Sequence, residues 1–293
     1  MYQSKIMLWV LAARPKTLPA AVAPVMVASA VAFADGNFAL LPAIGCLVCA
    51  IMLQIAVNFA NDYFDYKNEI DSDERMGPVR VTQSGLIPPG QVKNAMIFTL
   101  MLAGLIFLYL ISVGGALVVV IGISSILAAL AYSGGPYPLA SNGLGELFVF
   151  IFFGLVAVCG TYFIQAGELS TLVLIASIPP GLLVTAIMVV NNHRDRETDK
   201  KAGKNTLAVI LGHKWTVREY SLLLVISYTV PLCMMFIPSV SVAVCLPLLT
   251  LPYGLSLIKE VRTVRGAALN ETLAKSARLS LFFSILFAVG LIA

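Results

Sequence analysis

The feature that most restricts the fold of this chain is a series of uninterrupted apolar runs. A membrane-spanning helix needs about 20 consecutive apolar residues, and the runs found here are about 18 to 22 residues long. Only 12% of the residues are charged, and the mean hydropathy is +0.92. The sequence therefore predicts an all-α, polytopic membrane protein and excludes a soluble enzyme with a large core. The nine predicted spans are residues 18–34, 38–60, 91–112, 114–133, 144–164, 170–192, 217–236, 239–258 and 277–293.

The basic residues predict how these spans cross the membrane. All 19 Lys and Arg gather in four places: before the first span, between the second and third, between the sixth and seventh, and between the eighth and ninth, when the first three residues of the following span are counted with each connection. Loops rich in Lys and Arg stay in the cytoplasm. We therefore expect a cytoplasmic N-terminus, long cytoplasmic loops that carry the chemistry, and a C-terminus outside. Residues 1–17 are expected to lie at the membrane interface.

Two of the predicted spans end in similar clusters of amides and acids. Asn61 and Asp65 end the second span, and Asn191 and Asp195 end the sixth with the same spacing. A further acid, then Gly and basic residues, follows each cluster. This repetition predicts two four-helix halves, 18–133 and 144–258, related by duplication, and a ninth helix at 277–293. We expect all of them to form a single domain, 1–293.

The spacing within each cluster points to bound metal. Residues i and i+4 share one face of a helix, so Asn61 with Asp65, and Asp195 with Asp199, each present two oxygen ligands in one direction. Acids at membrane depth are costly and normally face an ion, a partner charge or water. Oxygen ligands suit Mg²⁺, which one or two carboxylates and substrate phosphates commonly hold. The alternative is that these acid-rich segments are only solvated connections.

Basic residues beside the two clusters would suit the remaining oxygens of a diphosphate. They are Arg75, Arg80, Arg194, Lys200, Lys201 and Lys204. The uncharged loop Tyr132 to Pro138 has two interpretations, a turn rich in Gly and Pro or an aromatic lid over the substrate. His193 and His213 are interpreted as surface residues rather than catalytic bases.

The two acidic motifs, N-D-x-x-D at 61–65 and D-x-x-x-D at 195–199, resemble the signatures of the UbiA superfamily of intramembrane prenyltransferases. Four further segments resemble the branch of this superfamily that prenylates 1,4-dihydroxy-2-naphthoate: residues 14–18, 77–85, 132–138 and 142–146. The resemblance extends from residue 14 to about residue 215. It implies a nine-helix bundle around a central cavity.

The resemblance also implies roles for individual residues. Asn61, Asp65, Asp195 and Asp199 would be catalytic, and with Asp71 they would hold Mg²⁺ against the diphosphate. Asp71 is preferred to Glu69 because the naphthoate branch uses the later acid. The remaining implied roles are acceptor binding or a lid for Arg14, Tyr132, Tyr137 and Asn192, and lower-ranked places for Asn58, Asp62 and Glu69.

The implied reaction transfers a polyprenyl group from polyprenyl diphosphate to 1,4-dihydroxy-2-naphthoate, with loss of CO₂ and diphosphate, to give demethylmenaquinone. The expected location is the bacterial inner membrane. No nucleic-acid partner is expected, and the sequence does not indicate an oligomeric state. Alternative functions are prenylation of another ring, such as 4-hydroxybenzoate or homogentisate, secondary transport of an anionic solute, or a structural role.

Overall fold

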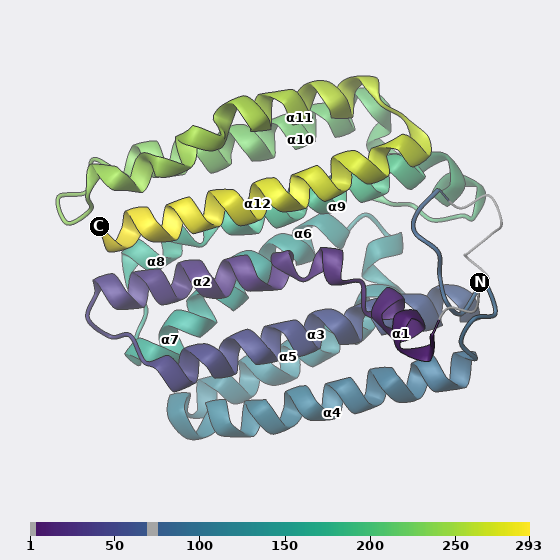
Figure 1. The fold of residues 1–293 in the computed structure, drawn as a ribbon, viewed down its shortest axis with the longest axis horizontal. Helices are drawn as coiled ribbons and strands as arrows, with labels where there is room; N and C mark the ends of the chain where they lie inside the picture. Colours follow the sequence, from purple (N-terminus) through teal and green to yellow (C-terminus); the bar gives the residue numbers. More distant parts are fainter. Residues whose placement is uncertain (1–3, 69–75) are drawn as a thin grey trace.

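A computed structural model describes residues 4–68 and 76–293, and these residues form helices and turns without a β-strand (Figure 1). The helices are α1 (Lys5–Ala13), η1 (Pro15–Thr17), α2 (Pro19–Ala34), α3 (Leu40–Lys67), α4 (Pro89–Gly114), α5 (Ala116–Ser133), η2 (Leu139–Ser141), α6 (Gly145–Val149), η3 (Phe150–Cys159), α7 (Gly160–Ala166), α8 (Thr171–Ala176), α9 (Ile178–Lys201), α10 (Leu207–Met234), η4 (Val242–Thr250), α11 (Leu251–Thr263), η5 (Gly266–Ala268) and α12 (Leu269–Ile292).

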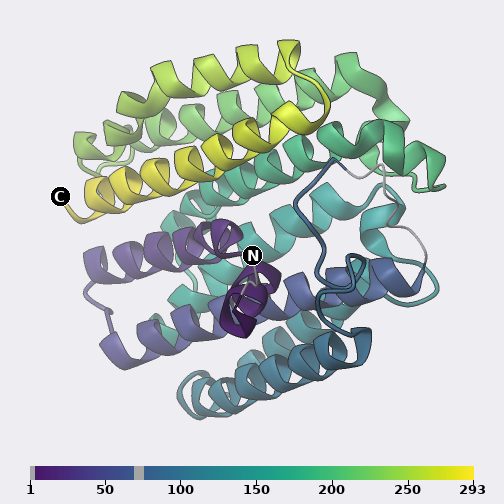
Figure 2. The ribbon, with the colours of Figure 1, turned by 45° about the vertical axis from the view of Figure 1, so that its right-hand side comes forward.

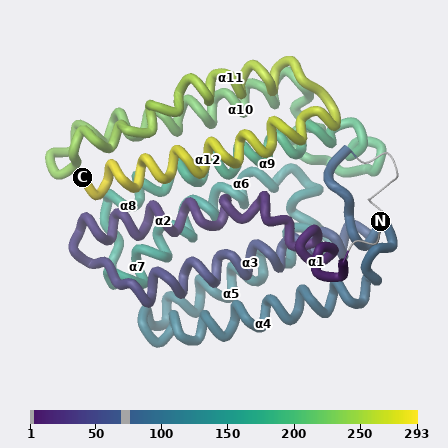
Figure 3. The backbone as a smooth tube through the Cα atoms, viewed as in Figure 1, coloured from purple at the N-terminus to yellow at the C-terminus, as the bar shows by residue number. Residues whose placement is uncertain are grey.

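The long helices lie side by side along one common direction (Figures 1 and 3). Eight helical segments of the described chain are long and apolar enough to cross a membrane. The segment Lys5–Thr17 and helix α2 meet at a bend of 49°, and counting this pair as one span gives up to nine. Helix α1 and the C-terminal end of α12 lie at opposite ends of the bundle, as an odd number of crossings requires (Figure 3). The predicted all-α membrane bundle is confirmed.

The helices that carry the acidic motifs continue beyond their apolar runs. We expected spans that end at residues 60 and 192, but α3 continues to Lys67 and α9 to Lys201. Polar residues keep a helix intact once it is nucleated, since each added residue closes another backbone hydrogen bond. Both motifs are therefore helical, and the assumption that their i and i+4 residues share a face is confirmed.

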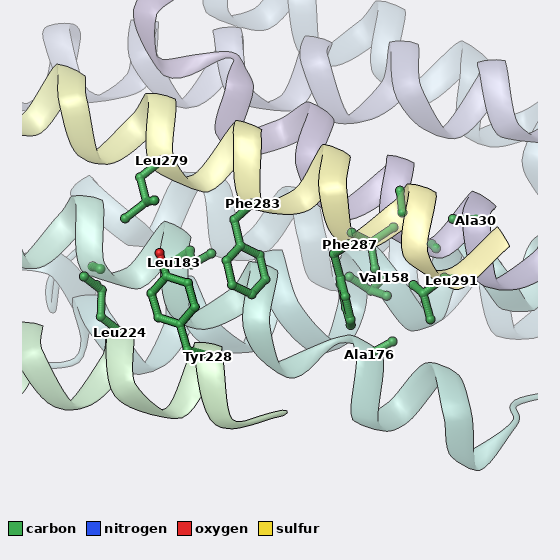
Figure 4. Close-up of a cluster of buried hydrophobic side chains, with 14 of the residues drawn as sticks. Ala30, Val158, Ala176, Leu183, Leu224, Tyr228, Leu279, Phe283, Phe287 and Leu291 are labelled. Carbon is green, nitrogen blue, oxygen red and sulfur yellow. The ribbon is translucent and has the colours of Figure 1, made fainter. Parts of the chain in front are cut away.

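The core is centred on α12, α9, α10 and α2. The ring of Phe283 packs edge-on against Tyr228 at a centroid distance of 5.3 Å, and Phe287 follows one turn along α12. Figure 4 shows Leu279, Phe283, Phe287 and Leu291 along α12, with Leu183 of α9 and Leu224 and Tyr228 of α10 below them. Helices α8 and α9 form the most deeply buried of the candidate spans, and Asp195 of the second acidic motif is buried as well.

Two glycines bring α9 close to η3, a π-helical segment. A methyl group added to Gly181 would lie 2.6 Å from the Cα of Gly154, closer than non-bonded carbons come. Small residues at such positions let membrane helices approach each other closely. This contact sets the position of α9 relative to η3, which forms part of the cavity wall described below.

Helix α1 lies across the cytoplasmic ends expected for α2 and α3, and Figure 2 shows it in front of α3. It packs on α3 through Trp9 and Phe59, whose ring centroids are 5.9 Å apart. Its opposite side exposes Ile6, Met7 and Val10. An exposed apolar stripe of this kind suits a helix at a membrane surface, and the interfacial location of residues 1–17 stays a prediction.

Candidate active site

Side chains from α2 to α7, from η3 and α9, and from the first part of α12 line a cavity of about 380 Å³. Most of its wall is apolar and includes Phe107, Leu110, Phe148, Phe152, Phe153 and Ile164. Its polar residues include Asn61, Asp65, Asn191, Asn192, Asp195 and Asp199, together with the cations Arg14, Lys16, Arg80 and Lys204. The two acidic motifs, far apart in sequence, therefore meet at one cavity.

Asp65 of the first motif is held by cations from two different connections. Its Oδ2 accepts a hydrogen bond from Nη2 of Arg80 at 2.5 Å, and its Oδ1 lies 3.6 Å from Nζ of Lys204. Arg80 precedes α4, whereas Lys204 lies between α9 and α10. Asp65 thus ties the segment before α4 and the segment between α9 and α10 to helix α3. Burial of both Asp65 and Arg80 makes their charge-assisted contact strong.

Asn61 lies one turn before Asp65 and also lines the cavity. The hydroxyl of Ser133, the last residue of α5, donates a hydrogen bond to Oδ1 of Asn61. This hydrogen bond from α5 fixes the orientation of the Asn61 side chain on α3. Sequence reasoning missed Ser133, because a lone serine at a helix end carries no distinctive signal.

The lower-ranked residues of α3 anchor neighbouring backbone. The carboxylate of Asp62 is buried and accepts hydrogen bonds from the backbone N–H groups of Val81 and Thr82 at 3.2 and 3.3 Å. Asn58 donates to the carbonyl of Ala13 at 2.9 Å, which ties α3 to the end of α1. Asp62 therefore places the segment that carries Arg80.

In the second motif, Arg194 holds the carboxylate of Asp195. Its Nε and Nη2 donate to the two carboxylate oxygens at 2.8 and 2.5 Å. The same guanidinium donates to Asn191 at 2.9 Å and to Asn270 of α12 at 2.8 Å. Arg194 is buried and does not line the cavity, whereas Asp195 and Asp199 do. The guanidinium therefore fixes the orientation of Asp195 from behind.

The other predicted site residues fall into three groups. Arg14, Tyr132 and Asn192 line the cavity. Lys200 and Lys201, in the last turn of α9, and Tyr137, which is 60% exposed, are not among the described residues that line it. Asp71 and Glu69, the two candidates for the last acid of the first motif, lie outside the described residues, and so does Arg75.

The interpretation of His193 as a surface residue is wrong. Its side chain is buried, and its Nε2 lies 3.1 Å from Nδ1 of His213. His213 in turn contacts Arg265 at 2.6 Å. The histidine was misread because α9 continues past the apolar run and stays in the centre of the bundle, so polar residues at its end remain covered.

Glu146 is a second residue that sequence reasoning left without a role. It is the second residue of α6 and is buried, and its Oε1 accepts a hydrogen bond from Asn192 at 2.7 Å. A signal was present, because an acid at the start of an apolar run is costly and normally functional. Glu146 stands within one of the segments on which the family resemblance rests.

The ligand set of the cavity can be tested against Mg²⁺. In the described part of the chain, no three His, Cys, Asp or Glu side chains converge closely enough to hold a metal ion by themselves. The acids instead stand on two helices around one cavity. Mg²⁺ usually takes one or two carboxylates and completes its shell with phosphate oxygens and water. The residues present therefore fit a metal that binds together with a diphosphate.

An ion-paired acidic site at a mostly apolar cavity inside a membrane bundle suits an amphiphile with an anionic head and a hydrocarbon tail. Residues 21–287 match the model of the UbiA prenyltransferase family, and the chain belongs to this family.

Relatives and solved structures agree with this assignment. The chain is 35% identical to the 1,4-dihydroxy-2-naphthoate octaprenyltransferase of Haemophilus influenzae, covering 100% of this chain and 98% of the relative. It is also 35% identical to the Escherichia coli enzyme of the same name, covering 98% and 96%. A UbiA homologue from Archaeoglobus fulgidus, solved with DMAPP and Mg²⁺, has the same fold, with a TM-score of 0.67, 16% identity and coverage of 97% and 98%.

Proposed function

We propose that this protein transfers a polyprenyl group from a polyprenyl diphosphate to 1,4-dihydroxy-2-naphthoate. The full-length similarity to two octaprenyltransferases that are named for this acceptor supports the proposal. The structural observation that carries it is the meeting of both acidic motifs at a single cavity with mostly apolar walls. A transporter would need substrate routes to both faces of the membrane, and no observation on the described residues favours a transporter.

The polar residues of the cavity would bind the diphosphate head. Asn61, Asp65, Asp195 and Asp199 would hold Mg²⁺, which supplies positive charge to the leaving diphosphate. Arg80 and Lys204 already contact Asp65 and would reach diphosphate oxygens from the same side. Lys200 and Lys201 add positive charge at the end of α9, and Arg194 keeps Asp195 in place.

The apolar wall would hold the first isoprene units of the donor. Phe148, Phe152 and Phe153 come from α6 and η3, and Phe107 and Leu110 come from α4. Breaking the donor C–O bond leaves an allylic cation that water would capture. Hydrocarbon walls exclude water, so the cation survives until the ring attacks it.

The acceptor ring would lie beside Arg14, Tyr132 and Asn192, which line the cavity near the acids. The ring carbon that bears the carboxylate attacks the cation and forms the new C–C bond. The carboxylate then leaves as CO₂, and its bonding electrons restore the aromatic ring. The product leaves as the hydroquinone, demethylmenaquinol, and its later oxidation gives demethylmenaquinone.

The test is a product assay read by mass spectrometry. Purified protein is incubated with Mg²⁺, polyprenyl diphosphates of several lengths, and 1,4-dihydroxy-2-naphthoate, 4-hydroxybenzoate or homogentisate. We expect decarboxylated, prenylated naphthoquinol, and loss of the product in Asp65→Ala and Asp195→Ala, with full activity in the exposed control Glu168→Gln. If only another ring gives product, the proposed acceptor is wrong. Undiminished product in both aspartate variants would contradict the proposed roles of Asp65 and Asp195.

We further propose that the site faces the cytoplasm of a bacterial inner membrane, which the placement of basic residues supports. Single cysteines at Lys201→Cys and Glu168→Cys, in a chain with its native cysteines replaced, can be labelled with an impermeant maleimide. In spheroplasts we expect labelling at position 168 only, and at position 201 after lysis. The reverse pattern would invert the orientation.

A further inference from the structure

Asn192 connects the cavity to a buried carboxylate behind it. Its side chain lines the cavity, and its Nδ2 donates a hydrogen bond of 2.7 Å to Oε1 of Glu146. Glu146 is only 5% exposed. Its other oxygen, Oε2, is buried and accepts no hydrogen bond from the described residues. Asn192 is therefore the side chain that the structure gives to this carboxylate as a hydrogen-bond donor.

This contact determines which end of the Asn192 amide is available to a ligand. The Oε1 atom accepts from the NH₂ end of the amide, which leaves the carbonyl end of Asn192 pointing elsewhere. Among the described residues, no group donates to Oδ1 of Asn192, and this oxygen is not one of the buried unpaired atoms. Since Asn192 lines the cavity, its carbonyl oxygen is a hydrogen-bond acceptor open to a bound molecule.

A matching donor lies close by. The hydroxyl of Tyr132 donates to Sδ of Met188 at 3.1 Å, and a thioether is a weak acceptor that a better one can replace. A methyl group built on Gly145, the residue before Glu146, would lie 3.6 Å from this hydroxyl. Tyr132, Met188 and Asn192 all line the cavity. A donor and an acceptor therefore stand at the same part of its wall.

A phenolic hydroxyl group both donates and accepts one hydrogen bond, so it would satisfy both groups. We propose that Glu146 is a positioning residue for the aromatic acceptor. It holds Asn192 so that Oδ1 accepts a hydrogen bond from a ring hydroxyl, while the Tyr132 hydroxyl donates to the same ring oxygen. The inference rests on the proposed function, since it names the group of the dihydroxynaphthoate that this wall recognises.

The test compares Michaelis constants for the two substrates in four variants: Glu146→Leu, Glu146→Gln, Asn192→Ala and the Glu146→Leu, Asn192→Ala double variant. Glu146→Leu frees the amide to rotate, and we expect its KM for the naphthoate to rise about tenfold while the KM for polyprenyl diphosphate stays unchanged. Glu146→Gln keeps a carbonyl that can accept from Asn192, so it should restore the KM. The double variant should match Asn192→Ala alone, because both changes remove one interaction.

A hydroxyl-deficient ligand gives a second measurement. We expect wild-type protein to bind a naphthoate that lacks the recognised hydroxyl about tenfold more weakly than the dihydroxy compound, and we expect this difference to shrink in Asn192→Ala, where the hydroxyl keeps only its contact with Tyr132. Both monohydroxy isomers are measured by calorimetry without donor, in wild type, Asn192→Ala and the Glu146 variants. If the Glu146→Leu protein does not fold and cannot be purified, the Glu146→Ala protein is used in its place in both measurements. Glu260→Gln, a carboxylate change on α11 away from the cavity, is the control.

The outcomes separate the two proposals. A wild type that forms no prenylated naphthoquinol contradicts the proposed function, and the calorimetric arm still tests recognition of the hydroxyl. An active wild type with an unchanged naphthoate KM in Glu146→Leu overturns the positioning role. Equal weakening of both substrates, or additive effects in the double variant, would show that Glu146 acts only on the fold and would also overturn it.

Discussion

Arg80 donates a hydrogen bond of 2.5 Å from Nη2 to Oδ2 of Asp65, and both side chains are buried at the cavity. The guanidinium thus reaches the same aspartate that both the sequence motif and the proposed metal require. A cation in this place neutralises the acid, and it would also reach the oxygens of a diphosphate bound at the cavity. The pair therefore offers a specific way to test the head-group site.

We predict that Arg80→Ala lowers kcat about a hundredfold, because it removes a charge that would stabilise the leaving diphosphate and leaves Asp65 with weaker compensation from Lys204. The rate of product formation by purified protein measures the effect. Arg262→Ala, at an exposed position of α11, should keep wild-type activity. An Arg80→Ala protein with normal kcat would show that this guanidinium has no part in transfer.

Asp62 is predicted to act through the backbone that carries Arg80. Asp62→Ala leaves the N–H groups of Val81 and Thr82 without their acceptor, which should cost about 1 to 3 kcal/mol of unfolding free energy and reduce activity indirectly. Asp62→Asn keeps one acceptor oxygen and should lose less. Thermal unfolding in detergent gives the comparison, and equal melting temperatures for Asp62→Ala and wild type would refute the anchoring role.

Metal removal should stop the reaction reversibly. We expect EDTA to abolish product formation and added Mg²⁺ to restore it. In Asp195→Asn, the Mg²⁺ concentration for half-maximal activity should rise about tenfold, because one charged ligand is lost and Arg194 no longer has a carboxylate to hold. Glu260→Gln serves as the carboxylate control here too. Activity that persists through chelation would argue against a metal-dependent transfer.

The glycine contact between η3 and α9 should be sensitive to a single methyl group. Gly181→Ala would place a carbon 2.6 Å from the Cα of Gly154, and we expect a loss of about 1 to 3 kcal/mol of stability. Gly104→Ala, in the middle of α4, has open space around it and should not destabilise the protein. A Gly181→Ala protein as stable as Gly104→Ala would mean that the two helices can separate without cost.

Much of the architecture could be predicted because it depends on local properties of the chain. The length of an apolar run decides whether a segment spans the membrane, and the i, i+4 spacing decides which side chains share a face. Both acidic motifs proved to be helical, as their spacing led us to expect, and they line one cavity, which the family resemblance implied. Helix ends were less predictable, since the apolar run of α9 ends before the helix does.

By itself, the sequence thus determined the membrane bundle and the two helical acidic motifs. Only the tertiary structure decided which partner each polar group has: Arg80 on Asp65, Arg194 behind Asp195, Asp62 on the backbone of Val81, and Glu146 on Asn192. The physical reason is that hydrophobic length and helical spacing are properties of a single segment. The partner of a buried polar side chain depends instead on how the connections and helices pack against one another in space.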